Sequence, residues 1–134
     1  QQDGLNRLTV EEFLENIANP IERDPKTARK ARQKLYDDLR KRAYRKLPKD
    51  MNPIEARKIS TMQAKESMSS LAALHNPDLI AGGKDVISDF GDRQVNSTIG
   101  PQWRSRVGEL TRSVEKQAKD GRASGFLNIR LHKC

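Results

Sequence analysis

His75 and Asp78 are the residues of this chain whose types and spacing most directly suggest chemistry. The sequence holds only two histidines, and His75 stands three residues before Asp78 in a Leu-His-Asn-Pro-Asp string. An imidazole and a carboxylate serve phosphodiester hydrolysis as a general base with its orienting partner, or as two ligands of a divalent metal. On spacing alone, a histidine that stabilises a helix C-terminus beside an Asn-Pro turn is the more common arrangement.

Further carboxylates follow the glycine pair at positions 82 and 83. These are Asp85, Asp89 and Asp92. Carboxylate oxygens suit Mg²⁺, which keeps several of its waters and needs only one or two protein carboxylates. Each of these aspartates taken alone is more typical of a helix cap or a turn. We nevertheless expect Asp92 to support the His75–Asp78 pair.

Polar and basic residues continue this segment towards Trp103, the only tryptophan of the chain. Asn96 and Gln102 could orient the catalytic pair or contact a phosphate. Arg93 and Arg104 could grip a phosphate through two parallel hydrogen bonds. Trp103 begins an apolar stripe at helical spacing, so we expect its ring to pack in the core.

Positive charge gathers in the segment 23–49. The chain has a formal net charge of +8, and this segment alone carries twelve Lys or Arg against three Asp. Such a basic face raises the local concentration of a polyanion and speeds its capture. A solvated helix or a partner-binding surface can have the same composition. The residues of this segment that we expect to contact nucleic acid are Arg29, Lys30, Arg40, Lys41 and Arg45.

Composition excludes several classes of protein. Aromatic residues make up 4% of the chain, which argues against a single-strand binder built on stacked rings. The one cysteine, Cys134, cannot form an intrachain disulfide. We recognise no signal peptide and no stretch long enough to span a membrane. Because the chain begins with Gln-Gln-Asp instead of Met, we expect it to be a fragment of a larger protein.

Helix signals place these residues in a single, mainly α-helical domain that spans residues 1–134, with about four main helices. Thr9 and Glu12 form a capping box at the start of the first helix, which Asn19 and Pro20 end. Cap-plus-proline pairs open the second helix, 25–47, and the third, which we expect to run from 53 to about 74. A glycine-rich region of loops follows, and the fourth helix is expected over 101–119. Residues 126–131 alternate apolar and polar side chains, which fits a short strand or an extended arm.

Three strings of the sequence resemble the novel toxin 15 class of bacterial polymorphic toxins. They are LNRLTVEEFLEN at 5–16, LHNPDLIAGG at 74–83 and GDRQVNSTIGPQW at 91–103. The resemblance implies an all-helical nuclease domain whose His-x-x-Asp motif is His75 and Asp78. It also implies a place at the C-terminus of a secreted effector, including effectors of type VI secretion.

The resemblance further implies a function for the whole domain. We expect a DNase toxin that uses a divalent metal, most simply Mg²⁺, held by His75 and Asp78. It would be exported with its parent effector by the secretion machinery, delivered into the cytoplasm of a target bacterial cell, and neutralised by a cognate immunity protein. Two alternatives stay open, namely an RNase with the same pair and a non-catalytic basic module that binds nucleic acid.

Overall fold

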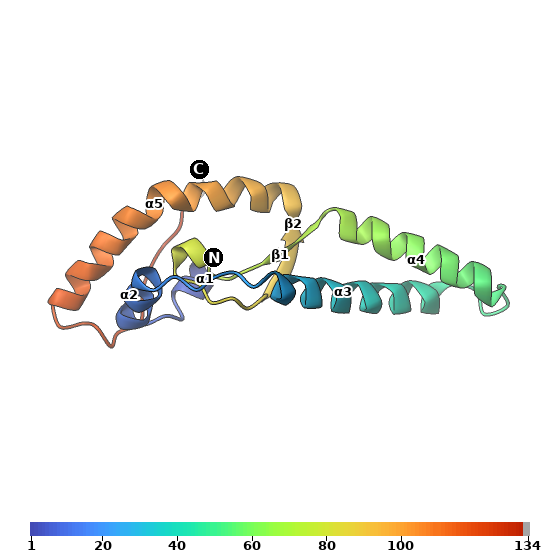
Figure 1. Ribbon diagram of the computed structural model, residues 1–134, viewed down its shortest axis with the longest axis horizontal. Coiled ribbons are helices and arrows are strands. Elements are labelled where there is room, and N and C mark those ends of the chain that lie inside the picture. The colour runs from blue at the N-terminus through green and yellow to red at the C-terminus, as the bar shows by residue number, and fades with distance from the viewer. Residues whose placement is uncertain (133–134) are drawn as a thin grey trace.

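The computed structural model describes residues 1–132 as an elongated molecule in two parts (Figure 1). The mainly α-helical fold with four long helices is confirmed. The elements in chain order are α1 (Gln2–Leu5), α2 (Val10–Ala18), α3 (Pro25–Lys46), α4 (Pro53–Ser69), β1 (Leu71–Leu74), the 3₁₀ helix η1 (Leu79–Ala81), β2 (Asp89–Asp92) and α5 (Arg93–Lys119). None of these helices is long and apolar enough to cross a membrane.

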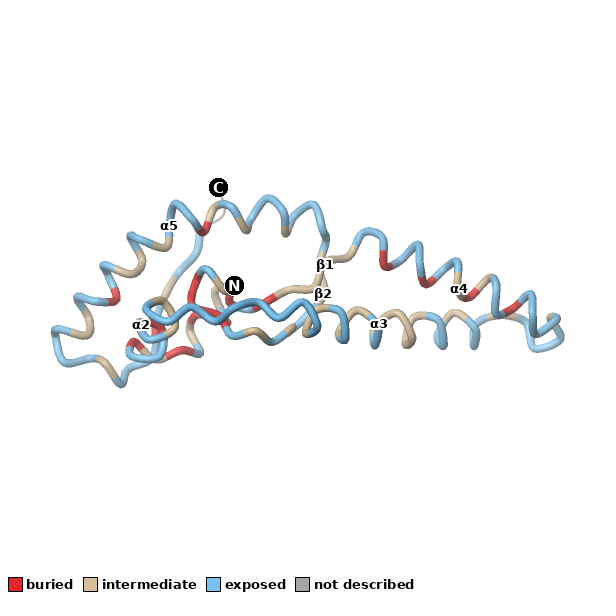
Figure 2. The backbone as a smooth tube through the Cα atoms, viewed as in Figure 1, coloured by how far each residue is buried: buried red, intermediate tan, exposed pale blue. Residues whose placement is uncertain are grey.

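One part, which we call the lobe, consists of α1, α2, η1, α5 and residues 120–132. Its buried side chains form one apolar cluster, seen as the red segments of the lobe in Figure 2. Phe13 and Leu5 are fully buried at its centre, and Trp103 and Val114 join it from α5. Burial of these apolar surfaces is what holds the five parts of the lobe together.

Local signals fix the start of α2 as the sequence predicts. The Thr9 hydroxyl accepts a hydrogen bond from the backbone N–H of Glu12 at 3.1 Å, and the Glu12 carboxylate accepts one from the N–H of Thr9 at 2.9 Å. This reciprocal capping box satisfies two of the N–H groups that a helix start leaves unpaired. Phe13 is thereby set on the face of α2 that meets the core.

The other part, which we call the arm, is the antiparallel hairpin of α3 and α4 (Figure 1). Asp24 caps α3 and Asn52 caps α4, each followed by proline at the first helical position. The buried face of α4 repeats every four residues as Ala56, Ser60, Ala64 and Met68. Small side chains at most of these positions let the two helices approach closely. The arm therefore packs on itself through one narrow stripe. Most basic side chains of α3 stay in solvent, but Arg32 is half-buried and donates to the Leu71 carbonyl at 2.9 Å.

The third helix is shorter than the sequence predicts. It ends at Ser69, and Leu71–Leu74 instead forms strand β1, which pairs antiparallel with β2 from Leu71 opposite Asp92 to Leu74 opposite Asp89. The prediction that His75 lies in the last turn of a helix is therefore wrong, because His75 follows a strand. Pairing with a segment that lies far along the chain outweighs the local helical preference of Leu-Ala-Ala-Leu.

The fourth long helix starts earlier than the sequence predicts. α5 begins at Arg93, and Pro101 lies inside it instead of at its start. The Asp92 carboxylate caps α5, because it accepts a hydrogen bond from the backbone N–H of Val95 at 2.9 Å. The helix therefore starts eight residues before the predicted start at Pro101. A proline inside a helix removes one backbone hydrogen bond, and α5 changes direction along its length (Figure 1).

The C-terminal segment crosses the lobe in an extended conformation, which is one of the two forms predicted for residues 126–131. It forms no named strand in the described chain, only an isolated bridge between Thr9 and Phe126. Asn6 holds it through both side-chain groups, donating to the Ile129 carbonyl at 3.0 Å and accepting the Ile129 N–H at 2.7 Å. Cys134 lies outside the described residues.

Candidate active site

The His75–Asp78 segment is fixed by the first residue of the chain. The side-chain N–H of Gln1 donates to the His75 carbonyl at 3.0 Å, and its side-chain oxygen accepts the backbone N–H of Asp78 at 2.7 Å. One amide thus bridges both ends of the predicted catalytic motif. Because it engages backbone groups, it leaves both functional side chains available.

Two glycines enclose the turn between His75 and Asp78. This turn contains a cis peptide bond between Asn76 and Pro77. A Cβ atom on Gly4 would overlap Asn76 and Pro77, and one on Gly83 would overlap the Pro77 carbonyl oxygen. The glycines therefore serve close backbone approach, which positions the turn against α1 on one side and the loop after η1 on the other.

The imidazole of His75 pairs with Asp85. Its Nε2 lies 2.8 Å from Oδ1 of Asp85, and only 5% and 11% of the two side chains are exposed. Since an ionised carboxylate can only accept, Nε2 carries the proton in this bond and the neutral ring keeps its lone pair at Nδ1. The bond fixes the orientation of the ring and its tautomer.

Asp85 is in turn held by the start of the basic helix. Its Oδ2 accepts the backbone N–H of Asp24 at 2.8 Å. That bond, followed by the hydrogen bonds from His75 and from the Thr27 side chain, lowers the pKa of the Asp85 carboxyl, and burial only partly opposes them. Asp85 therefore remains ionised beside the imidazole at neutral pH.

Asp78 has a different position from the one expected of an orienting partner. Its Oδ1 accepts the backbone N–H of Ile80 at 3.1 Å and caps η1. Of the two roles that the sequence suggests for Asp78, orientation of His75 therefore falls to Asp85. That Asp78 is a metal ligand stays a prediction, and its side chain is only partly buried.

The three supporting residues lie at the start of α5 or on it. Asp92 is exposed and caps the helix. Asn96 is half-buried one turn further on. Gln102 donates a hydrogen bond to the Thr98 carbonyl at 3.2 Å and lines a large cavity beneath α5. The structure brings none of these three side chains into a hydrogen bond with His75.

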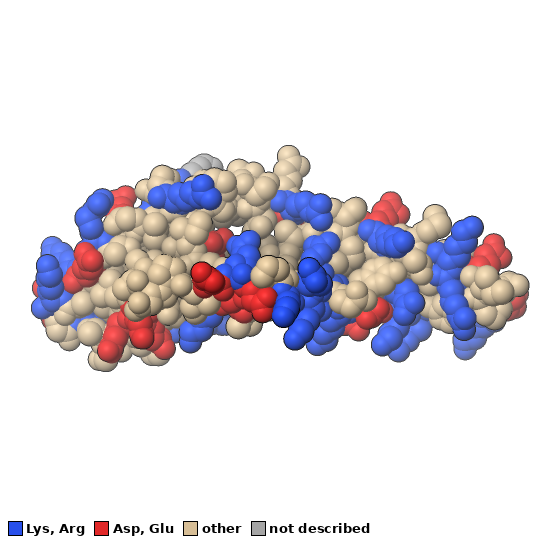
Figure 3. All heavy atoms as spheres, in the orientation of Figure 1, with Lys and Arg blue, Asp and Glu red and all other residues tan. Residues whose placement is uncertain are grey.

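Basic side chains cover the arm along its length (Figure 3). The five residues of α3 that we expect to contact nucleic acid are all exposed, and the same holds for Arg93 and Arg104 on α5. Three of the five, joined by Arg57 of α4, line a hollow of about 370 Å³ between the two helices. These three are Arg40, Lys41 and Arg45. The arm therefore presents clustered cations to one side, as a phosphate-binding surface requires.

Sequence comparison identifies the family of the chain. The family model described as novel toxin 15 matches residues 1–132. The chain belongs to the novel toxin 15 family. It is therefore a toxin domain of the polymorphic type, and the resemblance read from its three strings is confirmed. A search of curated proteins finds no match to the chain.

The donor set of this novel toxin 15 domain limits how a metal could bind. Within residues 1–132, no three His, Cys, Asp or Glu side chains gather as a metal cage. A histidine ligand ordinarily donates its other ring N–H to a carboxylate, and His75 has this bond to Asp85. Mg²⁺ completes its shell with water and substrate phosphates. A divalent ion at this site would therefore take most of its ligands from water and substrate, and His75 and Asp78 stay the predicted protein ligands.

Sequence reasoning missed two parts of the toxin's candidate site. Asp85 belonged to the acidic set, but its pairing with His75 depends on a loop that returns from η1 to the start of α3. Gln1 had no sequence signal, because its role is to bridge backbone groups. Only the fold reveals that one end of the chain closes around residues 75–78.

Proposed function

We propose that this toxin domain is a nuclease that hydrolyses phosphodiester bonds in the DNA of a target cell. The observation that carries the proposal is the Nε2–Oδ1 bond of 2.8 Å between His75 and Asp85, buried at the start of the basic arm. A scarce histidine oriented by an ionised carboxylate is the arrangement that general-base catalysis uses. The arm beside it would hold the polyanionic substrate.

In this mechanism His75 acts as the general base through Nδ1. A water gives its proton to Nδ1 while its oxygen forms a bond to the scissile phosphorus. The bond from phosphorus to the leaving oxygen breaks, and that oxygen takes a proton from solvent. Asp85 stabilises the imidazolium that forms, because it accepts the Nε2 proton in a charge-assisted hydrogen bond.

A divalent metal, most simply Mg²⁺, belongs to the proposal as the cofactor. When bound, it would neutralise charge that develops on the scissile phosphate. Asp78 would hold it through its carboxylate, and His75 would hold it through Nδ1 if that nitrogen is a ligand instead of the base. In either case Asp85 keeps the ring in place.

An RNase is the second candidate, because the hydrogen bond from His75 to Asp85 would serve a reaction without a metal equally well. In such a reaction His75 would take the proton of the ribose 2′-OH, a group that only RNA offers. The third candidate, a basic module without catalysis, assigns the His75–Asp85 pair to stability alone.

The proposal extends to delivery and control. We place this domain in a larger secreted effector that enters the cytoplasm of a rival bacterium. A cognate immunity protein would protect the producing cell. Because the arm is strongly basic, an acidic surface on that immunity protein would complement it and compete with nucleic acid.

Supercoiled plasmid tests the nuclease directly. The domain is incubated with plasmid in Mg²⁺ and in chelator, beside His75→Ala and Asp85→Asn variants and a matched Asp120→Asn control at an exposed position. We expect nicking that needs metal, is lost in the first two variants and is retained in the control. Plasmid that stays intact throughout, with RNA cut instead, would replace the DNase with the RNase. If neither is cut, the non-catalytic module remains.

A further inference from the structure

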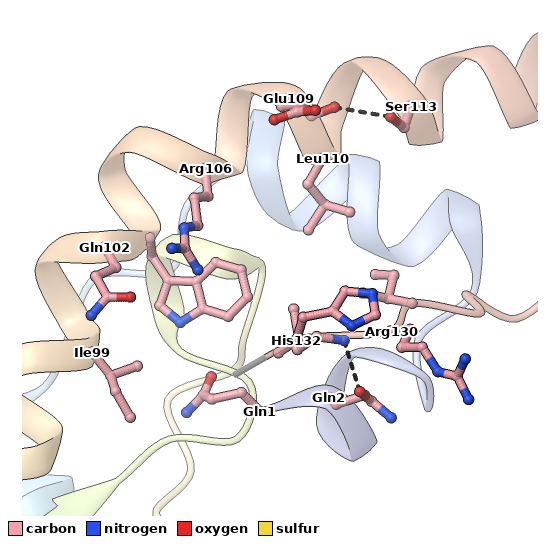
Figure 4. Close-up of a pocket in the computed structure, with 13 residues that line it drawn as sticks. Gln1, Gln2, Ile99, Gln102, Arg106, Glu109, Leu110, Ser113, Arg130 and His132 are labelled. Atoms are coloured by element: carbon pink, nitrogen blue, oxygen red, sulfur yellow. Dashed lines mark hydrogen bonds between the residues drawn. The ribbon is translucent and has the colours of Figure 1, made fainter. Parts of the chain in front are cut away.

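A large cavity lies beneath α5, apart from the His75–Asp85 pair. It encloses about 830 Å³ between α5, the N-terminal glutamines and the C-terminal segment. In Figure 4, Gln102 and Arg106 extend from α5 towards Gln1 and Gln2 on the opposite wall. The volume lies within the range of about 300–1,000 Å³ of small-molecule sites.

Hydrogen bonds across the chain hold the walls of this cavity. Gln2 accepts the backbone N–H of Leu131 at 2.8 Å, and Asn6 makes its two bonds to Ile129. The C-terminal segment is thereby fastened to α1 along one side of the opening. The cavity is thus a feature of the packed lobe and not a gap beside a loose tail.

Trp103 brings to the cavity wall an indole N–H that has no hydrogen-bond acceptor. It lines the space, is 6% exposed, and its indole Nε1 is the one buried side-chain nitrogen or oxygen among residues 1–132 without a hydrogen-bond partner. Buried polar groups in native proteins are nearly always paired. Because Nε1 is itself buried, an acceptor atom in the cavity would reach it after a small shift of the indole ring. The new hydrogen bond would recover the free energy that this N–H loses on burial.

The other lining groups narrow the class of ligand. Ile99 and Leu110 offer apolar surface, Gln102 offers a polar side chain at the wall, and Arg106 and Arg130 offer positive charge. A simple anion has no apolar surface to place against Ile99 and Leu110. An apolar molecule has no charge to place beside Arg130 and no acceptor for the indole N–H. A nucleotide has a flat ring with acceptor atoms and a phosphate, so it uses all of these groups.

Gln1 connects this cavity to the proposed catalytic segment. Its side chain lines the cavity and also bonds the His75 carbonyl and the Asp78 N–H. A nucleotide seated against Gln1 would therefore contact the side chain that holds the backbone of both proposed catalytic residues.

We propose that the cavity binds one unpaired nucleotide of the substrate strand, with its base against Trp103 and its phosphate near Arg106. The inference rests on the proposed function, since it takes nucleic acid as the substrate. On duplex DNA the domain would have to draw a nucleotide out of the stack, at an unstacking cost that an unpaired strand avoids. The domain would therefore prefer single-stranded or frayed sites.

The only tryptophan reports on its own cavity. We would titrate the His75→Ala chain with a single-stranded oligodeoxynucleotide, with the same sequence as duplex, and with inorganic phosphate, following Trp103 emission. We expect a saturable change with the single strand, binding weaker by about tenfold with duplex, and no change with phosphate. Arg106→Gln should weaken single-strand binding by about tenfold, whereas Arg112→Gln, an exposed arginine on the same helix outside the cavity, should weaken it by much less.

Three results would overturn this inference. They are an emission that no oligonucleotide changes, equal affinity for single strand and duplex, and equal losses in Arg106→Gln and Arg112→Gln. Because the titration measures binding in a variant that does not cleave, it is independent of the plasmid assay. If the domain nicks plasmid but shows any of these results, only the nucleotide-binding proposal is rejected. If it binds as expected but never cleaves, only the nuclease proposal is rejected.

Discussion

Asp24 donates its backbone N–H to Oδ2 of Asp85 across 2.8 Å. Asp24 is also the residue that caps α3. The start of the basic arm and the carboxylate that holds His75 are therefore one connected structure. A nucleic acid bound along α3 would extend towards the His75 imidazole. A substitution at the start of α3 would alter the position of Asp85 and therefore the orientation of the His75 ring.

Asp85→Asn tests this connection at the catalytic step. Asparagine keeps the size of the side chain but can present an amide N–H to Nε2, so the ring loses its fixed tautomer. We expect the cleavage rate on the preferred nucleic acid to fall by roughly 10²- to 10⁴-fold, the usual contribution of a general base. Thr27→Val removes only one hydroxyl from Asp85 and should reduce the rate by about tenfold or less. A full rate in Asp85→Asn would refute the assignment of Asp85.

The lowered pKa of Asp85 predicts a pH dependence of stability. A carboxyl whose pKa is lower in the folded chain stabilises the fold above its unfolded pKa of about 3.9. That contribution is lost as the pH falls through the folded pKa. We therefore expect a difference in urea midpoint between the natural chain and Asp85→Asn at about pH 6, and we expect it to shrink below about pH 4. An unchanged difference at acid pH would contradict a stabilising role for the ionised Asp85 carboxylate.

Glycine substitutions test how tightly residues 75–78 are enclosed. Gly4→Ala and Gly83→Ala each place a Cβ against backbone of the Asn76–Pro77 turn. Because backbone cannot move aside as a flexible side chain can, we expect each to lower the free energy of unfolding by about 1–3 kcal/mol. Chemical denaturation would measure it.

The matched control comes from α5. Gly108→Ala introduces a Cβ that meets nothing within 4 Å. Since alanine favours a helix interior over glycine, it should raise the free energy of unfolding by about 0.5–1 kcal/mol. Equal losses in all three variants would mean that close approach to the turn is not what the two glycines provide.

Much of the helical framework could be predicted because its signals are local. Thr9 with Glu12, Asp24 with Pro25, and Asn52 with Pro53 each mark a helix start within a few residues, and all three starts are observed. The basic character of α3 is likewise a property of neighbouring residues. Helix capping depends on residues within one turn of the helix start, so the sequence alone indicates it.

The strand and the site could not be predicted in this way. Whether Leu71–Leu74 is helix or strand depends on Asp89–Asp92 lying beside it. The sequence indicates a histidine paired with an aspartate, but the hydrogen bond joins His75 to Asp85, ten residues away, instead of to Asp78. Asp78 instead caps η1, beyond the turn at Asn76 and Pro77.

The arm makes a prediction about salt. Replacing Arg40, Lys41 and Arg45 together with glutamine removes three charges from one hollow between α3 and α4. We expect weaker binding to nucleic acid and a shallower plot of log affinity against log salt, by up to about 0.9 in slope for each phosphate that the variant no longer binds. Titrations at several salt concentrations, with the His75→Ala chain, would measure both quantities.

The control for the arm removes the same charge elsewhere. Lys116, Lys119 and Arg122 are exposed at the far end of the lobe, and replacing them with glutamine lowers the net charge by an equal amount. If affinity and slope fall only for the arm variant, phosphates lie along α3 and α4. Equal falls in both variants would mean that binding follows net charge alone. In that case the basic helix is solvated surface, and its link to Asp85 through Asp24 serves the fold instead of guiding substrate.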